Sequence, residues 1–192
     1  MKNTVAFLFI YLVFVAACKE EKKEDKKFIS IVSLIKEQVA DVDTSLYPIL
    51  KITTTDSSHI DTTYIKREDF AATAKDFLSI PDLSDQKIAQ RFQEEAPRYD
   101  DLLNRVIITY TPIHPEKETI KKQEMLVTPN PEGDKVNNII VTREISNKDS
   151  FFQQKMLWQM NKYFQVITTR QKVGQPEETT VTKVSWNDET PL

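Results

Sequence analysis

Apolar residues change their spacing along the chain, and the change divides the expected elements into two groups. In the segments 28–40 and 67–96 they recur mostly every three to four residues, as on one face of a helix. Within 28–40 these positions are Phe28, Ile31, Ile35 and Val39, which predicts an N-terminal amphipathic helix. From residue 106 onward apolar and polar residues alternate, which is the pattern of half-buried strands.

A β-hairpin and a short helix are predicted to follow the first helix. Residues 48–55 and 60–65 are rich in β-branched side chains and are separated by a polar break, which predicts two paired strands. In the next segment, Phe70, Ala74 and Phe77 fall on one helical face. A proline shortly after this face ends the predicted helix.

A second short helix is predicted over 83–96. Ser84 is a suitable N-cap, and Ile88, Phe92 and Ala96 share one helical face. Pro97 directly follows this segment and ends it, because proline cannot continue a helix.

Five strands are predicted for the remainder of the chain, at 106–113, 120–128, 136–145, 155–172 and 179–186. Short polar links between consecutive strands favour an antiparallel meander, although the segment "KDSFFQQK" could instead begin with a helical turn. The expected fold class is therefore α+β, a five-stranded antiparallel meander covered by helices on one face. A cystatin-like fold and the half-barrel of periplasmic lipoprotein carriers are both compatible with this order of elements.

The N-terminal residues are predicted to be an export signal. Lys2 is followed, at 5–17, by a run of thirteen uncharged and mostly apolar residues. The last three of them form "VAAC" with Cys18, the only cysteine of the chain. The apolar run is shorter than a bilayer-spanning helix requires and has the layout of a secretory signal peptide. "VAAC" resembles the lipobox of bacterial lipoproteins, with Val15 where leucine is commoner. The alternative is ordinary cleavage that leaves a free thiol, which is a liability in an oxidising compartment.

The lipobox resemblance implies three segments. Residues 1–17 are a lipoprotein signal peptide, 18–27 are a charged tether lipidated at Cys18, and 28–192 are a single domain. The tether "KEEKKEDKK" has no apolar residue, so a solvated spacer is a sufficient explanation for it. In Bacteroidetes, some outer-membrane lipoproteins carry a surface-export signal directly after the cysteine, and Lys19-Glu20-Glu21 resembles one form of it. We expect attachment to the outer membrane, on the cell surface rather than the periplasmic face.

Composition and candidate chemistry give little support to catalysis. The formal net charge is −3 and no basic stripe is present, so nucleic acid is not an expected partner. The chain has two glycines, too few for the phosphate-cradling loops of nucleotide enzymes. His59 and His114 lie in predicted loops, without a neighbouring ligand at metal-binding spacing. No cofactor or metal is expected.

Acidic and aromatic residues provide the remaining candidates for a site. The carboxylates Glu94, Glu95, Asp100 and Asp101 are interpreted as a solvated face rather than as an acid–base pair. The apolar residues of the last strands have two interpretations. They form the edge of the core, or they line a shallow pocket or binding strip; the ligand-binding candidates are Trp158, Met160, Phe164 and Trp186.

The sequence therefore predicts a non-enzymatic lipoprotein, held in the outer membrane through Cys18, that presents a binding or scaffolding domain to a possible envelope protein partner. The alternative is a carrier or sensor that binds a lipid or another apolar ligand on the concave face of the sheet. A carrier requires a continuous apolar cavity, whereas a scaffold requires a closed core.

The lipidation of Cys18 can be tested directly. Two or three acyl chains exceed the single-chain limit of reversible membrane binding, so Cys18→Ala is expected to abolish both lipid labelling and signal-peptide processing. Metabolic labelling with a fatty acid and fractionation of membranes measure both effects. A Cys18→Ala protein that is still cleaved and labelled would contradict the lipobox interpretation.

Overall fold

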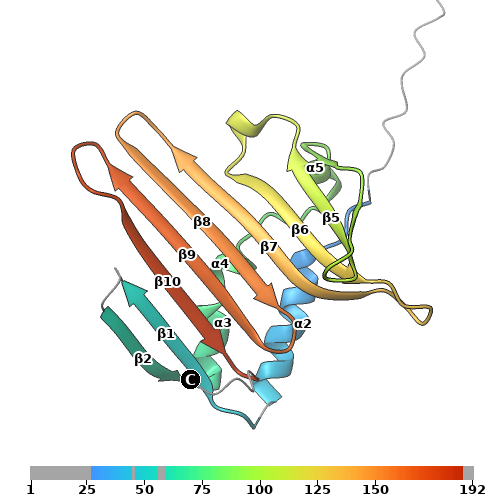
Figure 1. Ribbon diagram of the computed structural model, residues 1–192, viewed down its shortest axis with the longest axis horizontal. Helices are drawn as coiled ribbons and strands as arrows, with labels where there is room; N and C mark the ends of the chain where they lie inside the picture. Colours follow the sequence, from blue (N-terminus) through green and yellow to red (C-terminus); the bar gives the residue numbers. More distant parts are fainter. Residues whose placement is uncertain (1–26, 45, 56–58, 188–192) are drawn as a thin grey trace, which may run out of the picture.

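The computed structural model describes residues 27–44, 46–55 and 59–187, and Cys18 with Lys19, Glu20 and Glu21 lies outside these residues. Its main feature is one antiparallel sheet of ten strands, with α2, α3 and α4 behind it in Figure 1. In chain order the elements are α2 (Ile31–Thr44), β1 (Ile49–Thr55), β2 (His59–Ile65), the 3₁₀ helix η2 (Arg67–Asp69), α3 (Phe70–Thr73), α4 (Lys75–Leu78), α5 (Gln86–Ala89), β3 (Phe92–Glu94), β4 (Arg98–Asp100), β5 (Arg105–Pro112), the 3₁₀ helix η3 (Pro115–Lys117), β6 (Ile120–Thr128), β7 (Lys135–Ser146), β8 (Ser150–Gln159), β9 (Tyr163–Lys172) and β10 (Glu178–Ser185).

The strand order explains how the two halves of the chain form one sheet. The order is β2-β1-β10-β9-β8-β7-β6-β5-β3, and β4 also pairs with β5. Strands β5 to β10 are a meander, and the N-terminal hairpin joins it beside β10, with Leu50 opposite Ser185. The segment with α3, α4 and α5 carries the chain from the β2 edge to the β3–β5 edge (Figure 1).

The first helix begins three residues later than predicted. The Ser30 hydroxyl accepts a hydrogen bond from the Ser33 amide at 3.0 Å, a contact that satisfies one of the free N–H groups at the start of α2. Phe28 is not part of the helical face, because its ring stacks on Tyr110 of β5 with centroids 4.6 Å apart. Ile35 and Val39 are buried as the pattern predicts.

The core lies between the helices and one face of the sheet, and aromatic rings form its centre. Phe70, Ala74 and Phe77 are fully buried, so the predicted helical face is confirmed, although the helix is divided into α3 and α4. The Phe77 ring lies 5.1 Å from Trp158 and 5.4 Å from Phe164. The T-shaped contacts of these rings add to the free energy gained by burying them.

The predicted fold class is wrong, because the chain is mainly β and its sheet has ten strands rather than five. One reason is that 155–172 is not a single strand. It contains the second half of β8 and all of β9, joined by a three-residue turn at 160–162. Trp158 pairs directly with Phe164, so apolar positions continue to alternate across the turn and the break is hidden in the pattern. The segment "KDSFFQQK" is not helical, because β8 begins at Ser150.

The predicted helix over 83–96 is also wrong in most of its length. Only α5 is helical, and its N-cap is Asp85 rather than Ser84, because the Asp85 carboxylate accepts from the Lys87 amide at 2.8 Å. Phe92 is fully buried in β3, where it pairs with Pro112 of β5. Pairing with β5 therefore overrides the helical spacing in the second half of this segment.

Removing a ring from the aromatic core should be costly if the core is closed. We expect Phe164→Ala to lower the free energy of unfolding by about 3–5 kcal/mol, through lost burial and the cavity left behind. Val173→Ala, at an exposed position, is the matched control and should change it by less than about 0.5 kcal/mol. Urea unfolding followed by circular dichroism measures both. A Phe164→Ala cost near that of the control would show that the cluster is not closed.

Candidate ligand-binding site at the β8–β9 turn

A side-chain contact between α2 and the β8–β9 turn lies beside two cavities of the described surface. The Gln38 amide donates to Asn161 Oδ1 at 2.9 Å, and the Asn161 backbone N–H donates to Gln38 Oε1 at 2.6 Å. Asn161 has φ +62°, a left-handed conformation that asparagine tolerates better than most residues. The buried Gln38 side chain therefore fixes the turn against the helix.

The backbone of the turn is held from the sheet side as well. The Lys162 carbonyl accepts from the amides of Trp186 and Asn187, at 3.1 and 3.3 Å. The Met160 amide donates to the carbonyl of Asn137 at 2.9 Å. Contacts from α2, β7 and the end of β10 thus fix every residue of the turn, so the side chains around it are preorganised.

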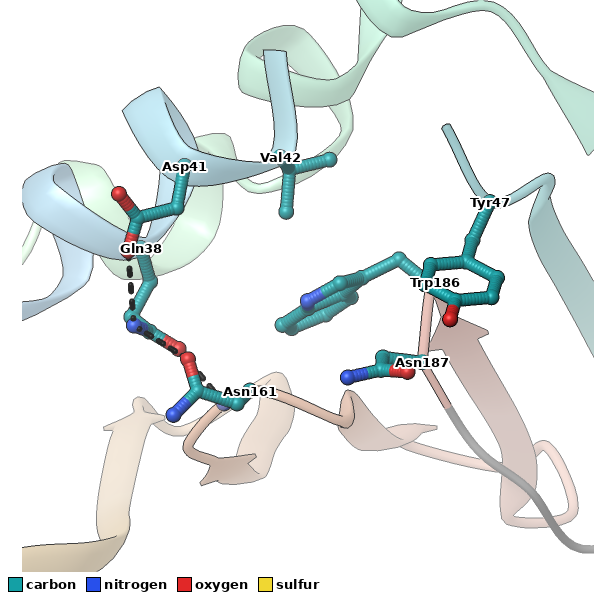
Figure 2. A pocket seen from close by; sticks show the side chains of 7 residues that line it. All are labelled: Gln38, Asp41, Val42, Tyr47, Asn161, Trp186 and Asn187. Atoms are coloured by element: carbon teal, nitrogen blue, oxygen red, sulfur yellow. Dashed lines mark hydrogen bonds between the residues drawn. The ribbon is translucent and has the colours of Figure 1, made fainter. Parts of the chain in front are cut away.

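The first of two cavities at this turn is the amide pocket, with a volume of about 160 Å³. In Figure 2, Gln38 and Asp41 lie on the helix side and Asn161 and Trp186 on the sheet side. The residues that line it are Gln38, Asp41, Val42, Tyr47, Asn161, Trp186 and Asn187. Amide groups both donate and accept, so this pocket can recognise a polar ligand beside the indole ring.

The second cavity is the cationic hollow, with a volume of about 320 Å³. It shares Asn161 and Asn187 with the amide pocket, so the two cavities adjoin. The described residues that line it are Arg105, Lys135, Asn137, Gln159, Met160, Asn161, Lys162 and Asn187. Three of these side chains are basic and none is acidic.

The predicted ligand-binding residues are divided between the core and these cavities. Trp158 and Phe164 are at most 1% exposed, and their stacked rings lie 5.1 Å apart. Trp186 lines the amide pocket, and Met160 lines the cationic hollow. The structure therefore places all four near one another but does not bring them together on one open apolar surface.

The other candidates lie elsewhere. His59 begins the edge strand β2 and is exposed, and His114 lies 3.6 Å from Glu116 on the surface. Glu94 is in β3, and the Asp100 carboxylate accepts from the Leu103 amide at 2.9 Å as part of a turn. Among the described residues, no three His, Cys, Asp or Glu side chains converge as metal ligands would.

Sequence reasoning missed Gln38 and Asn161. Asn161 carried a usable signal, because "Met-Asn-Lys" between two alternating runs contains a residue that favours turns and left-handed backbone. Gln38 carried none, since a polar residue within an amphipathic helix is ordinarily solvated.

Within the part of the chain that the structure covers, no helix is long and apolar enough to cross a bilayer. No protein-family model, curated protein or solved structure matches the chain.

The contact between Gln38 and Asn161 should contribute measurably to stability. Gln38→Ala removes the partner of the partly buried Asn161 N–H, and the loss of each such hydrogen bond costs about 0.5–1.5 kcal/mol. Gln171→Ala, at an exposed position of β9, is the matched control and should have little effect. Urea unfolding measures the two free energies, and the Asn161 amide resonance reports whether the turn itself has moved. An unshifted resonance with unchanged stability would mean that Gln38 does not hold the turn.

Proposed function

We propose that this chain is a non-enzymatic lipoprotein, anchored in the outer membrane through Cys18, whose domain binds or scaffolds an envelope partner. The observation that carries the proposal is the junction at Cys18. An apolar run ending in "VAAC" meets a tether of charged residues there. That order suits a chain that is exported, lipidated and then held away from the bilayer by a solvated spacer.

The way the domain begins supports a short, direct attachment. The Ile29 amide donates to the Tyr110 hydroxyl at 3.3 Å, and the Ser30 hydroxyl donates to Asp82 at 2.9 Å. Burial raises the pKa of Tyr110, against the lowering effect of the hydrogen bond from Ile29. The chain is therefore packed on the domain from Phe28 onward, immediately after the tether. Ten extended residues span at most roughly 35 Å, so the proposed anchor keeps the domain close to the membrane.

The character of the cavities supports binding of a polar partner or ligand. The aromatic rings at the centre of the core fill the space between α3, α4 and the sheet. The described cavities at the β8–β9 turn are lined mainly by amide and charged side chains. Polar groups at fixed positions give orientation and specificity in a binding site.

The alternative proposal is a carrier or sensor for a lipid or another apolar ligand on the concave face. Such a ligand would need space beside Trp158 and Phe164. Phe70 lies 6.1 Å from the Phe164 ring, so α3 and α4 would have to move away from the sheet before a ligand could enter. Nothing in the described contacts favours that movement, and for this reason we place the carrier second.

We further propose that the domain is displayed on the cell surface and that Lys19-Glu20-Glu21 is the export signal. Replacing these three residues by alanine should keep the lipid anchor but move the protein to the periplasmic leaflet. Protease shaving of intact cells measures the accessible fraction. It is expected to fall from most of the protein to near zero.

The tether offers a matched control. Lys23→Ala with Glu24→Ala and Asp25→Ala removes the same set of charges a few residues further along and should leave accessibility unchanged. Equal accessibility in both triple variants would contradict the signal. If the parent itself resists shaving while remaining membrane-bound, the domain faces the periplasm.

A further inference from the structure

We propose that the cationic hollow binds an anionic group, a phosphate or a carboxylate, carried by the ligand of this domain. The inference rests on the proposed binding function and adds the chemical class of what is bound. The residues that give the hollow its charge are Arg105, Lys135 and Lys162, which come from three different strands or turns. They meet because β5 and β7 begin at the same end of the sheet at which the turn joins β8 to β9.

Among the described residues, none of the three cations has an acidic partner. The ion pairs found among the described residues are Lys66–Glu68, Arg91–Glu118, His114–Glu116 and Lys122–Glu124, and none of them involves the hollow. The chain as a whole carries a formal net charge of −3. A cluster of unpaired positive charge on an acidic protein attracts anions, and a concave shape concentrates that field.

The Arg105 side chain is positioned to bind the anionic group of a ligand. Its Nη1 donates to Asn138 Oδ1 at 2.6 Å, and the side chain is half-buried. A guanidinium has five N–H donors in a planar fork, so one fixed bond orients the group and leaves other donors for a ligand. Planar, paired donation to carboxylate or phosphate is the interaction at which arginine is strongest.

Other residues that line the cationic hollow add hydrogen-bond donors for an anionic ligand. The amides of Asn161 and Asn187 border the same space, and Asn161 is fixed by Gln38. Asn137 also lines it, but its amide already donates to Thr128 Oγ1 and to the Lys135 carbonyl. A volume of about 320 Å³ is at the lower end of small-ligand sites, which suits a headgroup or a small acid rather than a large apolar molecule.

Asp41 limits the direction in which the ligand extends. It lines the amide pocket on the far side of Asn161 and accepts from Gln38 at 3.4 Å. A second anion there would be repelled, whereas a hydroxyl or an amine would be a favourable partner. The two adjoining cavities thus favour a ligand with an anionic end in the hollow and a hydrogen-bond donor beside Asp41.

The test uses the full-length protein in nonionic detergent and three probes: pyrophosphate, citrate and micelles doped with phosphatidylglycerol. Binding is followed by tryptophan fluorescence and by the amide resonances of Lys162 and Asn187. The site variant is Lys135→Gln with Lys162→Gln, because neither lysine side chain makes a hydrogen bond or ion pair with another described residue. The matched control is Lys148→Gln with Lys172→Gln, two exposed lysines at the opposite end of β8 and β9.

We expect saturable binding of at least one probe, weakened tenfold or more in the site variant and less than twofold in the control. Binding of pyrophosphate or citrate would identify a free anionic solute as the source. A response to doped micelles alone, with the same dependence on the two variants, would identify a lipid headgroup. No saturation by any probe, or equal weakening in both variants, would overturn the proposal. Surface display is measured separately, so a failure here with normal display leaves the proposed anchoring and display intact.

Discussion

Contact between the rings of α3 and α4 and the central strands is the interaction on which the rest of this structure depends. One face of a ten-stranded sheet must be covered, and the chain has little helix to cover it with. Phe70 and Phe77 are placed where the sheet presents Trp158 and Phe164, so two very short helices bury the largest apolar side chains. Neither helix is long enough to be stable alone, and the aromatic contact is what keeps the crossing segment on the sheet.

The candidate site follows from this arrangement. With α3 and α4 on the centre of the sheet, α2 lies along their side (Figure 1) and brings Gln38 to the β8–β9 turn. Two hydrogen bonds join Gln38 to Asn161, which borders both cavities, and the two cavities differ in charge. On one side is the Asp41 carboxylate, and on the other are Arg105, Lys135 and Lys162. A ligand that occupied both cavities would be oriented by its own distribution of charge. A small number of fixed polar groups gives specificity in this way.

Local elements of this fold could be predicted from the sequence, whereas its extent and its site could not. The N-terminal hairpin and the buried face of Phe70, Ala74 and Phe77 depend on neighbours in the chain, and both lie where the pattern places them. The division of β8 from β9 could not be seen in the alternation, because the turn preserves it. Gln38 and Asn161 are 123 residues apart, and nothing in the residues around either one signals the other. Non-local contacts of this kind decide where a site lies, and a pattern with a short period does not contain them.

The position of β10 between β9 and β1 sets an order for folding. The N-terminal hairpin precedes the meander in the chain, yet the strand that connects the two, β10, is the last of the described strands, so the described sheet is complete only after β10 has been synthesised. Pairings between distant segments form slowly, because the entropy of closing a long loop is lost before the contacts are gained. For a chain that is proposed to be threaded across a membrane, this delay suits transport, because the N-terminal hairpin cannot join the meander until β10 has followed it.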